Sequence, residues 1–234
     1  MFEIKPREIA VSIGIAFISL ALMFTLGESI VGSINEKSYE TLKATHIDSV
    51  ESFQYGIETG FGDVLAYGEL VANDPITNPE IGEKCMYIEK VTEQKVKHVS
   101  KNSKGRRSVH YTWEVVDRDV QTSSTVSFLG STFDYSKVTV PTQEQTSRHY
   151  FGNYRYYYNY TPDTLVGSLH TFLTTEGVSE GSYLYAHKDP NEVVNHLEGS
   201  INLSYRLLYI VWIILTAIII IGFFYFDNRW LDGK

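Results

Sequence analysis

Two apolar runs without a charged residue lie near opposite ends of this chain, Ile9–Leu26 and Leu207–Phe226. Each has about the 18 to 20 residues that a helix needs to cross roughly 30 Å of hydrocarbon. A helix satisfies its own backbone hydrogen bonds, so it is the form that such a run takes in lipid. The pattern therefore predicts two transmembrane helices with a polar domain between them.

The two runs divide the chain into five expected parts. These are a tail at 1–8, a first transmembrane helix at 9–27, one mostly β domain at 28–189, a long helix at 190–226 that includes the second transmembrane helix at about 207–226, and a tail at 227–234. The middle part has the length of a single domain. The predicted fold class is therefore an α+β membrane protein, in which two transmembrane helices flank one mostly antiparallel β domain.

The short tails predict the orientation of the chain. Each carries two basic residues, Lys5 and Arg7 in the first and Arg229 and Lys234 in the second. Basic residues next to a membrane span favour the cytoplasmic side. The first run is followed by no clear small-x-small cleavage site, so we expect an uncleaved signal anchor. Both termini are then cytoplasmic, and the main domain is extracytoplasmic.

The charge balance narrows the choice of partners. The chain has a formal net charge of −8, and the acidic excess lies between the two runs. An acidic domain argues against nucleic acid as a partner. The expected partners are the lipid bilayer, other membrane or envelope proteins, or further copies of the chain in a homo-oligomer.

Residues that carry chemistry are scattered. The seven histidines show no metal-ligand spacing, and Cys85, the only cysteine, cannot form an intramolecular disulfide. We expect a buried structural thiol at Cys85, because no motif supplies a base for a nucleophile. The sequence therefore predicts no enzyme, no metal site and no cofactor. The absence of charges within the apolar runs argues against a transporter.

A β-hairpin with a basic tip is the clearest local unit. The runs Cys85–Val99 and Ser108–Val120 alternate in polarity around a polar loop. The return strand places Val109, Tyr111, Trp113 and Val115 on one face, which we expect to be the buried side of a sheet. The tip carries four basic candidates for protein contact: Lys101, Lys104, Arg106 and Arg107.

A tyrosine ladder follows. Tyr154, Tyr156, Tyr158 and Tyr160 alternate over seven residues, and a period of two puts them on one face of a strand. Four tyrosines on one face build a core or a protein interface, and they are the second set of candidates for protein contact. The alternative is a platform on which a sugar or another ligand stacks.

Several flanking segments have clear local signals. Asp63–Val71, Leu165–Leu173 and Ser182–Ala186 read as strands, and Glu36–Phe53 reads as a short helix or connector. The sequence Asp189-Pro190-Asn191-Glu192 carries the residues of a helix start. In the first run, the small residues Ser12, Gly14 and Ala16 are expected to allow close contact between the membrane helices.

One stretch resembles a known family. It comprises Gly62–Leu70, Asp74-Pro75-Ile76, Cys85–Val91 and Tyr111-Thr112-Trp113-Glu114. The stretch is similar to the membrane-adjacent β-domain of the LUMA family of transmembrane proteins and the mitochondrial ubiquitin ligase MULAN. The resemblance covers about Gly62 to Thr112. It implies a membrane-bound scaffold that binds proteins, without ligase activity because the RING domain of MULAN has no counterpart here.

These observations favour a non-enzymatic scaffold or assembly protein whose extracytoplasmic domain binds proteins or self-associates. Two alternatives stay open. One is a viral or mobile-element membrane factor that modifies the envelope or blocks entry. The other is an extracytoplasmic hydrolase whose catalytic residues come together only in the fold.

Overall fold

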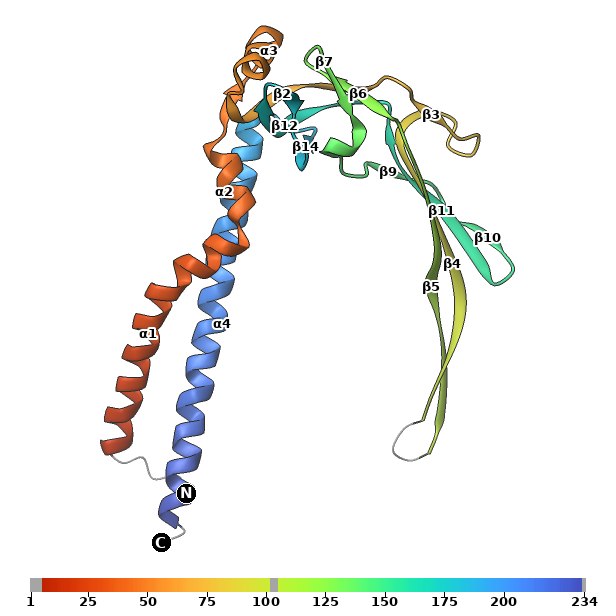
Figure 1. The fold of residues 1–234 in the computed structure, drawn as a ribbon. Helices are drawn as coiled ribbons and strands as arrows, with labels where there is room; N and C mark the ends of the chain where they lie inside the picture. Colours follow the sequence, from red (N-terminus) through yellow and green to blue (C-terminus); the bar gives the residue numbers. More distant parts are fainter. Residues whose placement is uncertain (1–5, 102–104, 233–234) are drawn as a thin grey trace. The chain divides into compact units, whose positions relative to one another are not determined.

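The predicted fold class is confirmed by a computed structural model, which describes residues 6–101 and 105–232. Two long apolar helices flank, in sequence, a β region of two curled and mostly antiparallel sheets (Figure 1). The chain divides into two compact units. One unit comprises residues 1–43 and 194–234, and the other comprises residues 44–193.

The helical unit contains the two apolar segments. α1 spans Pro6–Ile34, α2 spans Glu36–Lys43, and α4 runs without interruption from Pro190 to Asp232. Both α1 and α4 are long and apolar enough to span a membrane, and no residue in the most apolar window of either is buried. α4 begins as the sequence predicts, because Asp189 Oδ1 accepts the Glu192 amide at 2.9 Å and Glu192 Oε2 accepts the Asp189 amide at 3.1 Å.

Polar contacts and small residues join α1 to α4. The Trp212 indole N–H lies 2.8 Å from Ser19 Oγ, and the Ser19 and Thr216 hydroxyls are 2.5 Å apart. A Cβ at Gly27 would lie 3.4 Å from Leu208, so glycine allows the helices to approach there. The expected contact at Gly14 is wrong, because nothing lies within 4 Å of its Cβ position. Ser12 is half-buried, and Ala16 lies beside Ser19 along a cavity between the helices.

The first sheet holds the main hydrophobic core. Its strands are β1 Thr45–Ile47, β2 Gly62–Ala72, β6 Thr125–Phe128, β7 Ser131–Asp134, β8 Val138–Thr139, β12 Thr164–Thr174, β13 Gly177–Val178 and β14 Ser182–Ala186. Their order is β7-β6-β2-β12-β14-β8, with β1 beside β2 and β13 beside β12. A short 3-10 helix, η1, spans Tyr135–Lys137. The predicted strands at 63–71, 165–173 and 182–186 are confirmed as β2, β12 and β14.

The helix α3, Val50–Thr59, packs against this sheet. Its N-cap Ser49 accepts a hydrogen bond from the Ser52 amide. The segment 36–53, expected to be a short helix or connector, comprises α2, β1 and the start of α3. Phe53 is fully buried, and its ring meets that of Phe128 edge to face at 5.6 Å. The close approach needs Gly56, where a Cβ would lie 2.7 Å from Leu173.

The second sheet contains the hairpin and the tyrosine strand. Its strands are β3 Ile76–Thr77, β4 Lys84–Lys101, β5 Arg107–Thr122, β9 Glu144–Gln145, β10 His149–Phe151 and β11 Tyr154–Pro162. The order is β10-β11-β4-β3, and β5 and β9 pair with β4 and β11. β11 pairs with β4 only as far as Gln94, so the outer part of β4 and β5 is a two-stranded ribbon (Figure 1).

The expected buried side of the return strand is wrong. Val109, Tyr111 and Val115 are 45–56% exposed, and Trp113 is half-buried. The alternation correctly predicted the strand and the two faces of its side chains. However, no described element of residues 44–193 covers the apolar face of β5 in the way that α3 covers the first sheet. The pairing also shifts by one residue where Glu93 faces Val115 and Thr92 faces Asp117, which leaves Val116 as a bulge.

Candidate protein-binding surface

The tyrosine ladder lies on one face of the second sheet, as its period predicts. β11 pairs antiparallel with β4, so Tyr154, Tyr156, Tyr158 and Tyr160 share their face with the partner residues Gln94, Thr92, Lys90 and Ile88. Exposure falls along the ladder, from 44% at Tyr154 to 4% at Tyr158 and 8% at Tyr160. The four tyrosines therefore do not form one uniform surface.

Hydrogen bonds fix the inner tyrosines. The Tyr160 hydroxyl donates to Glu144 Oε2 at 2.7 Å, and this bond raises the pKa of Tyr160. The Tyr156 and Tyr158 hydroxyls donate to the two oxygens of Glu80, each at 3.2 Å. Tyr158 and Tyr160 pack with Cys85 and Ile88 in a small buried cluster. These two tyrosines stabilise the fold, so the outer pair are the better candidates for contact with a partner.

The Tyr156 ring already has two close contacts within the sheet. His149 stacks on it with centroids 5.2 Å apart, and Lys90 Nζ lies 4.7 Å from its centroid. Tyr154 lies at the outer end of the ladder, opposite Phe151 of β10, which is 80% exposed. Tyr154 and Phe151 are thus the part of the tyrosine face open to a partner.

The other face of the sheet carries an aromatic and charged cluster. Arg155 pairs with Glu93, and its guanidinium carbon lies 4.4 Å above the Trp113 ring. Trp113 meets Tyr150 edge to face at 5.9 Å. The alternation of the ladder places Arg155 on this face, but the pairing of β5 with β4 that brings Trp113 to it is a tertiary feature. Only the structure brings these residues together.

An apolar row follows β5 on that same face. We call it the β5 stripe, and it consists of Val109, Tyr111, Trp113 and Val115. Lysines on β4 lie beside it, with Lys95 opposite Trp113 and Lys97 opposite Tyr111. Lys95 Nζ also lies 5.1 Å from the centroid of the Tyr111 ring. A row of apolar side chains next to a row of lysines is a surface that a second protein can cover from the outer side.

The β5 stripe lies on an open edge. Among the described residues, β4 is the only strand that pairs with β5, so the outer side of β5 offers unpaired backbone groups over its length. Edge strands of this kind add strands from other chains unless they are short, covered or strongly charged. β5 spans 16 residues, and no described element of its own unit covers it. Four of its five Asp, Glu, Lys or Arg residues lie outside 109–115, so the charge is weak along the stripe itself.

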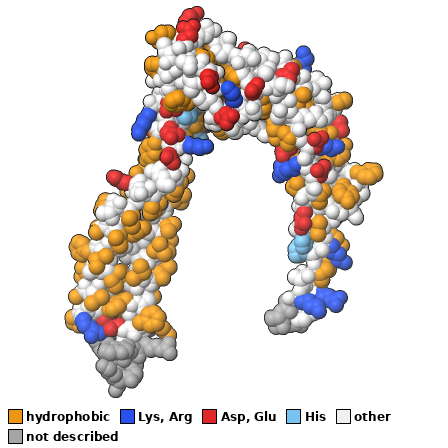
Figure 2. Space-filling view, in the orientation of Figure 1, with side chains coloured by type: hydrophobic (Ala, Val, Ile, Leu, Met, Phe, Trp, Pro, Cys, Tyr) orange, Lys and Arg blue, Asp and Glu red, His pale blue; other side chains and the backbone are white. Residues whose placement is uncertain are grey.

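The predicted basic tip is only partly described. Lys101, Arg106 and Arg107 are exposed at the end of the ribbon, and Lys104 lies outside the described residues. Figure 2 shows lysine and arginine side chains gathered at this end. The tyrosine face and the tip lie at different places along the same sheet, and the β5 stripe runs between the tip and the body of the sheet.

Cys85 and the histidines are the side chains whose chemistry most often serves catalysis or metal binding. Cys85 is fully buried, and burial raises the pKa of its thiol to about 11, so it stays protonated and inert at neutral pH. His98 lies 2.9 Å from Glu114 and stacks on His110. In the part of the chain that the structure describes, no group of three or more His, Cys, Asp or Glu residues could hold a metal ion.

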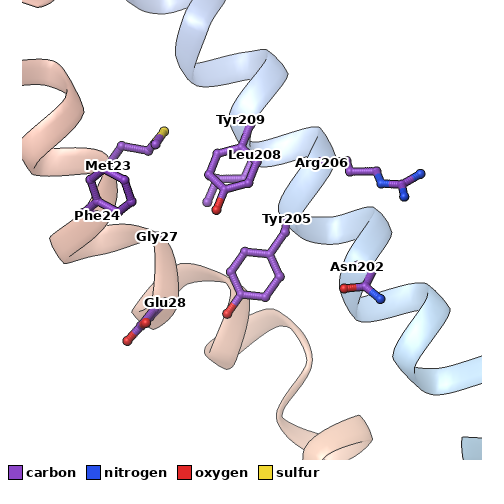
Figure 3. Close-up of a pocket in the computed structure, with 9 residues that line it drawn as sticks. All are labelled: Met23, Phe24, Gly27, Glu28, Asn202, Tyr205, Arg206, Leu208 and Tyr209. Atoms are coloured by element: carbon purple, nitrogen blue, oxygen red, sulfur yellow. The ribbon is translucent and has the colours of Figure 1, made fainter.

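A cavity of about 620 Å³ lies between α1 and α4. Figure 3 shows its lining, with Tyr205 and Tyr209 directed from α4 toward α1. The Glu28 and Arg206 side chains, by contrast, extend away from the space between the helices. The two charged groups therefore do not face each other, and the cavity belongs to the packing of the helix pair.

Comparison with known proteins adds no relative: no protein-family model, curated protein or solved structure matches this chain.

Proposed function

We propose that this chain is a membrane-anchored, non-enzymatic scaffold or assembly protein. Its β domain lies on the extracytoplasmic side and binds proteins or further copies of the chain. α1 and α4 hold it in the bilayer, and the second sheet supplies the binding surface. The resemblance to the LUMA family and MULAN points to the same kind of role.

One observation carries the proposal. The β5 stripe combines exposed apolar side chains with an open strand edge. Tyr111, at the middle of this stripe, is 56% exposed. Exposed apolar rows on an unpaired edge favour association with another chain.

The test is the mass of the complex extracted in detergent or in nanodiscs, with its co-purifying chains identified. We expect a defined oligomer or a stable partner for the parent protein. The variant Tyr111→Ser with Val115→Ser should dissociate the complex, because it removes two exposed members of the stripe. Tyr55→Ser is the matched control, since Tyr55 is 62% exposed and lies on α3, which packs against the first sheet.

The mass measurement distinguishes three results. Loss of the complex in the stripe variant, with the Tyr55→Ser complex intact, supports the proposal. A monomer without partners in the parent protein contradicts it. A complex that survives the stripe variant moves the contact to Tyr154, Phe151 or the tip, and would contradict the role given to β5.

The proposed orientation has its own test. Glu176 is exposed between β12 and β13, and Cys85 is buried, so Glu176→Cys offers a single reactive thiol. A membrane-impermeant maleimide added to intact cells should label it. Labelling that occurs only after the cells are opened would place the domain in the cytoplasm.

A further inference from the structure

We infer that the outer edge of β5 binds the β5 strand of a second copy of this chain, antiparallel and about a two-fold axis at Thr112. This inference rests on the proposed function, and it names the partner and the register. It follows from three properties of β5: an open edge, a side-chain order that complements itself when reversed, and a separation of charge along the strand.

The open edge sets the length of the contact. The ladder of β5 with β4 is regular from Arg107 to Val115 and shifts at the Val116 bulge. Regular backbone therefore covers Arg107–Val115, and within this stretch the seven residues Val109–Val115 are centred on Thr112. Because opposite residues in an antiparallel pair lie on the same face, a two-fold axis at the central residue keeps both faces in register.

The apolar face complements itself in this register. Val109 lies opposite Val115 of the second copy, and Tyr111 lies opposite its Trp113; each pair occurs twice. On its inner side the β5 stripe of each copy has Lys95 opposite Trp113 and Lys97 opposite Tyr111, and its outer side is open. Self-pairing joins the two stripes into one apolar strip between two lysine rows. Aromatic and β-branched cross-strand pairs of this kind stabilise a sheet.

The polar face is also complementary. His110 lies opposite Glu114 of the second copy, whose carboxylate also lies 2.9 Å from His98 of its own chain, and Thr112 lies opposite its equivalent. An axis at Tyr111 would instead place His110 opposite Thr112, and one at Trp113 would place Glu114 opposite Thr112. Among these neighbouring registers, only the axis at Thr112 pairs the histidine with the carboxylate.

Charge along the strand favours the antiparallel direction. Arg106 and Arg107 lie at the tip end, and Asp117 and Asp119 lie beyond the bulge at the other end; all four are exposed. Arg118, between the two aspartates, pairs with Glu89 of β4. Antiparallel pairing brings the basic end of one strand beside the acidic end of the other. Parallel pairing in register would set Arg107 against Arg107 and Glu114 against Glu114, which is unfavourable.

Cysteine cross-linking of the full-length protein in nanodiscs or native membranes tests this register. The native thiol is buried, so the parent protein is expected to show no cross-link. Thr112→Cys should form a disulfide-linked dimer under mild oxidation, because opposite Cα atoms in an antiparallel ladder are about 4.5–5.5 Å apart, within disulfide range. Val109→Cys alone should not, since its two copies would be six residues apart along the strand, or about 20 Å.

Two different cysteine variants in the same cells test whether Val109 lies opposite Val115. Val109→Cys and Val115→Cys proteins, each silent alone, should cross-link when they are co-expressed. We expect at least about tenfold more dimer from Thr112→Cys than from either single variant alone, because the separation excludes a disulfide. This pattern supports the inference.

Other patterns overturn it in distinguishable ways. Self-cross-linking at Thr112, Val109 and Val115 alike would indicate parallel stacking. No cross-link in a complex that contains a different co-purified protein would mean that β5 binds that protein, so the inference fails and the proposed function stands. A monomer without partners in the mass measurement would remove both.

Discussion

β12 and β5 are both long strands with alternating side chains, but the apolar side chains are buried along β12 and exposed along β5. Along β12, Leu165, Leu169 and Leu173 are at most 3% exposed, because α3 and the strands around β12 enclose them. Along β5, the apolar residues are mostly half exposed or more. The same pattern of alternation therefore serves a core in one sheet and an open surface in the other.

The difference shows what alternation does and does not encode. Period two specifies a strand and assigns its residues to faces. The layer that covers a face is a separate matter, decided by distant segments such as α3 or by another chain. An uncovered apolar face in a protein that is otherwise well packed is thus informative about binding.

Substitutions at Phe53 and Tyr111 should have the most different effects on stability. Phe53→Ala should lower the free energy of unfolding by about 3–5 kcal/mol, because it empties a fully buried position against Phe128. Tyr111→Ala should change it by less than about 0.5 kcal/mol in the monomeric protein, since its ring is half in solvent. Thermal unfolding in detergent, followed by circular dichroism, measures both. Equal losses would mean that β5 is part of the core.

Gly167 tests how tightly the first sheet is packed. A Cβ there would lie 2.4 Å from the Tyr185 carbonyl oxygen, so Gly167→Ala must separate β12 from β14. We expect a loss of about 2–3 kcal/mol, typical of overpacking. Gly199→Ala is the control, because nothing lies within 4 Å of that Cβ position in α4. A silent Gly167→Ala variant would show that β14 gives way easily.

The tyrosine ladder offers a sharper contrast within one strand. Tyr160→Phe should cost about 1–2 kcal/mol, because it removes a hydroxyl bonded to Glu144 in a buried site. Tyr154→Phe should be nearly silent in unfolding, since Tyr154 is 44% exposed. Urea unfolding of the two variants side by side is the measurement. A comparable loss at Tyr154 would contradict the division of the ladder into an inner and an outer pair.

Asp74 gives the smallest effect, and one that depends on pH. Its carboxylate accepts the Ser123 hydroxyl at 2.6 Å and the amides of Ser124 and Thr125, which lower its pKa well below the usual range. The stabilisation is therefore fully present above the unfolded pKa of about 4 and is lost as the pH falls toward the lowered pKa.

Asp74→Asn should thus lower the melting temperature at neutral pH, and the difference from the parent should narrow below about pH 4. Melting curves across an acid series check this. A difference that stays constant with pH would assign the effect to shape rather than to charge.

Local chemistry made much of the fold predictable. The apolar runs, the start of α4 at Pro190, the hairpin and the tyrosine face all follow from periods and caps. The pairing of Arg155 with Trp113 and the burial of Tyr158 do not, because they depend on β11 and β5 flanking β4 across long stretches of sequence. The open edge of β5 is likewise a property of topology.

The bulge at Val116 limits the length over which a strand of another chain can pair regularly with β5. Regular pairing over Val109–Val115 spans about 24 Å, and beyond it the backbone falls out of step with any straight strand. A short stretch of edge pairing gives modest binding energy. Contacts made there can form and separate readily, and the same break discourages the endless stacking that leads from open β edges to fibrils.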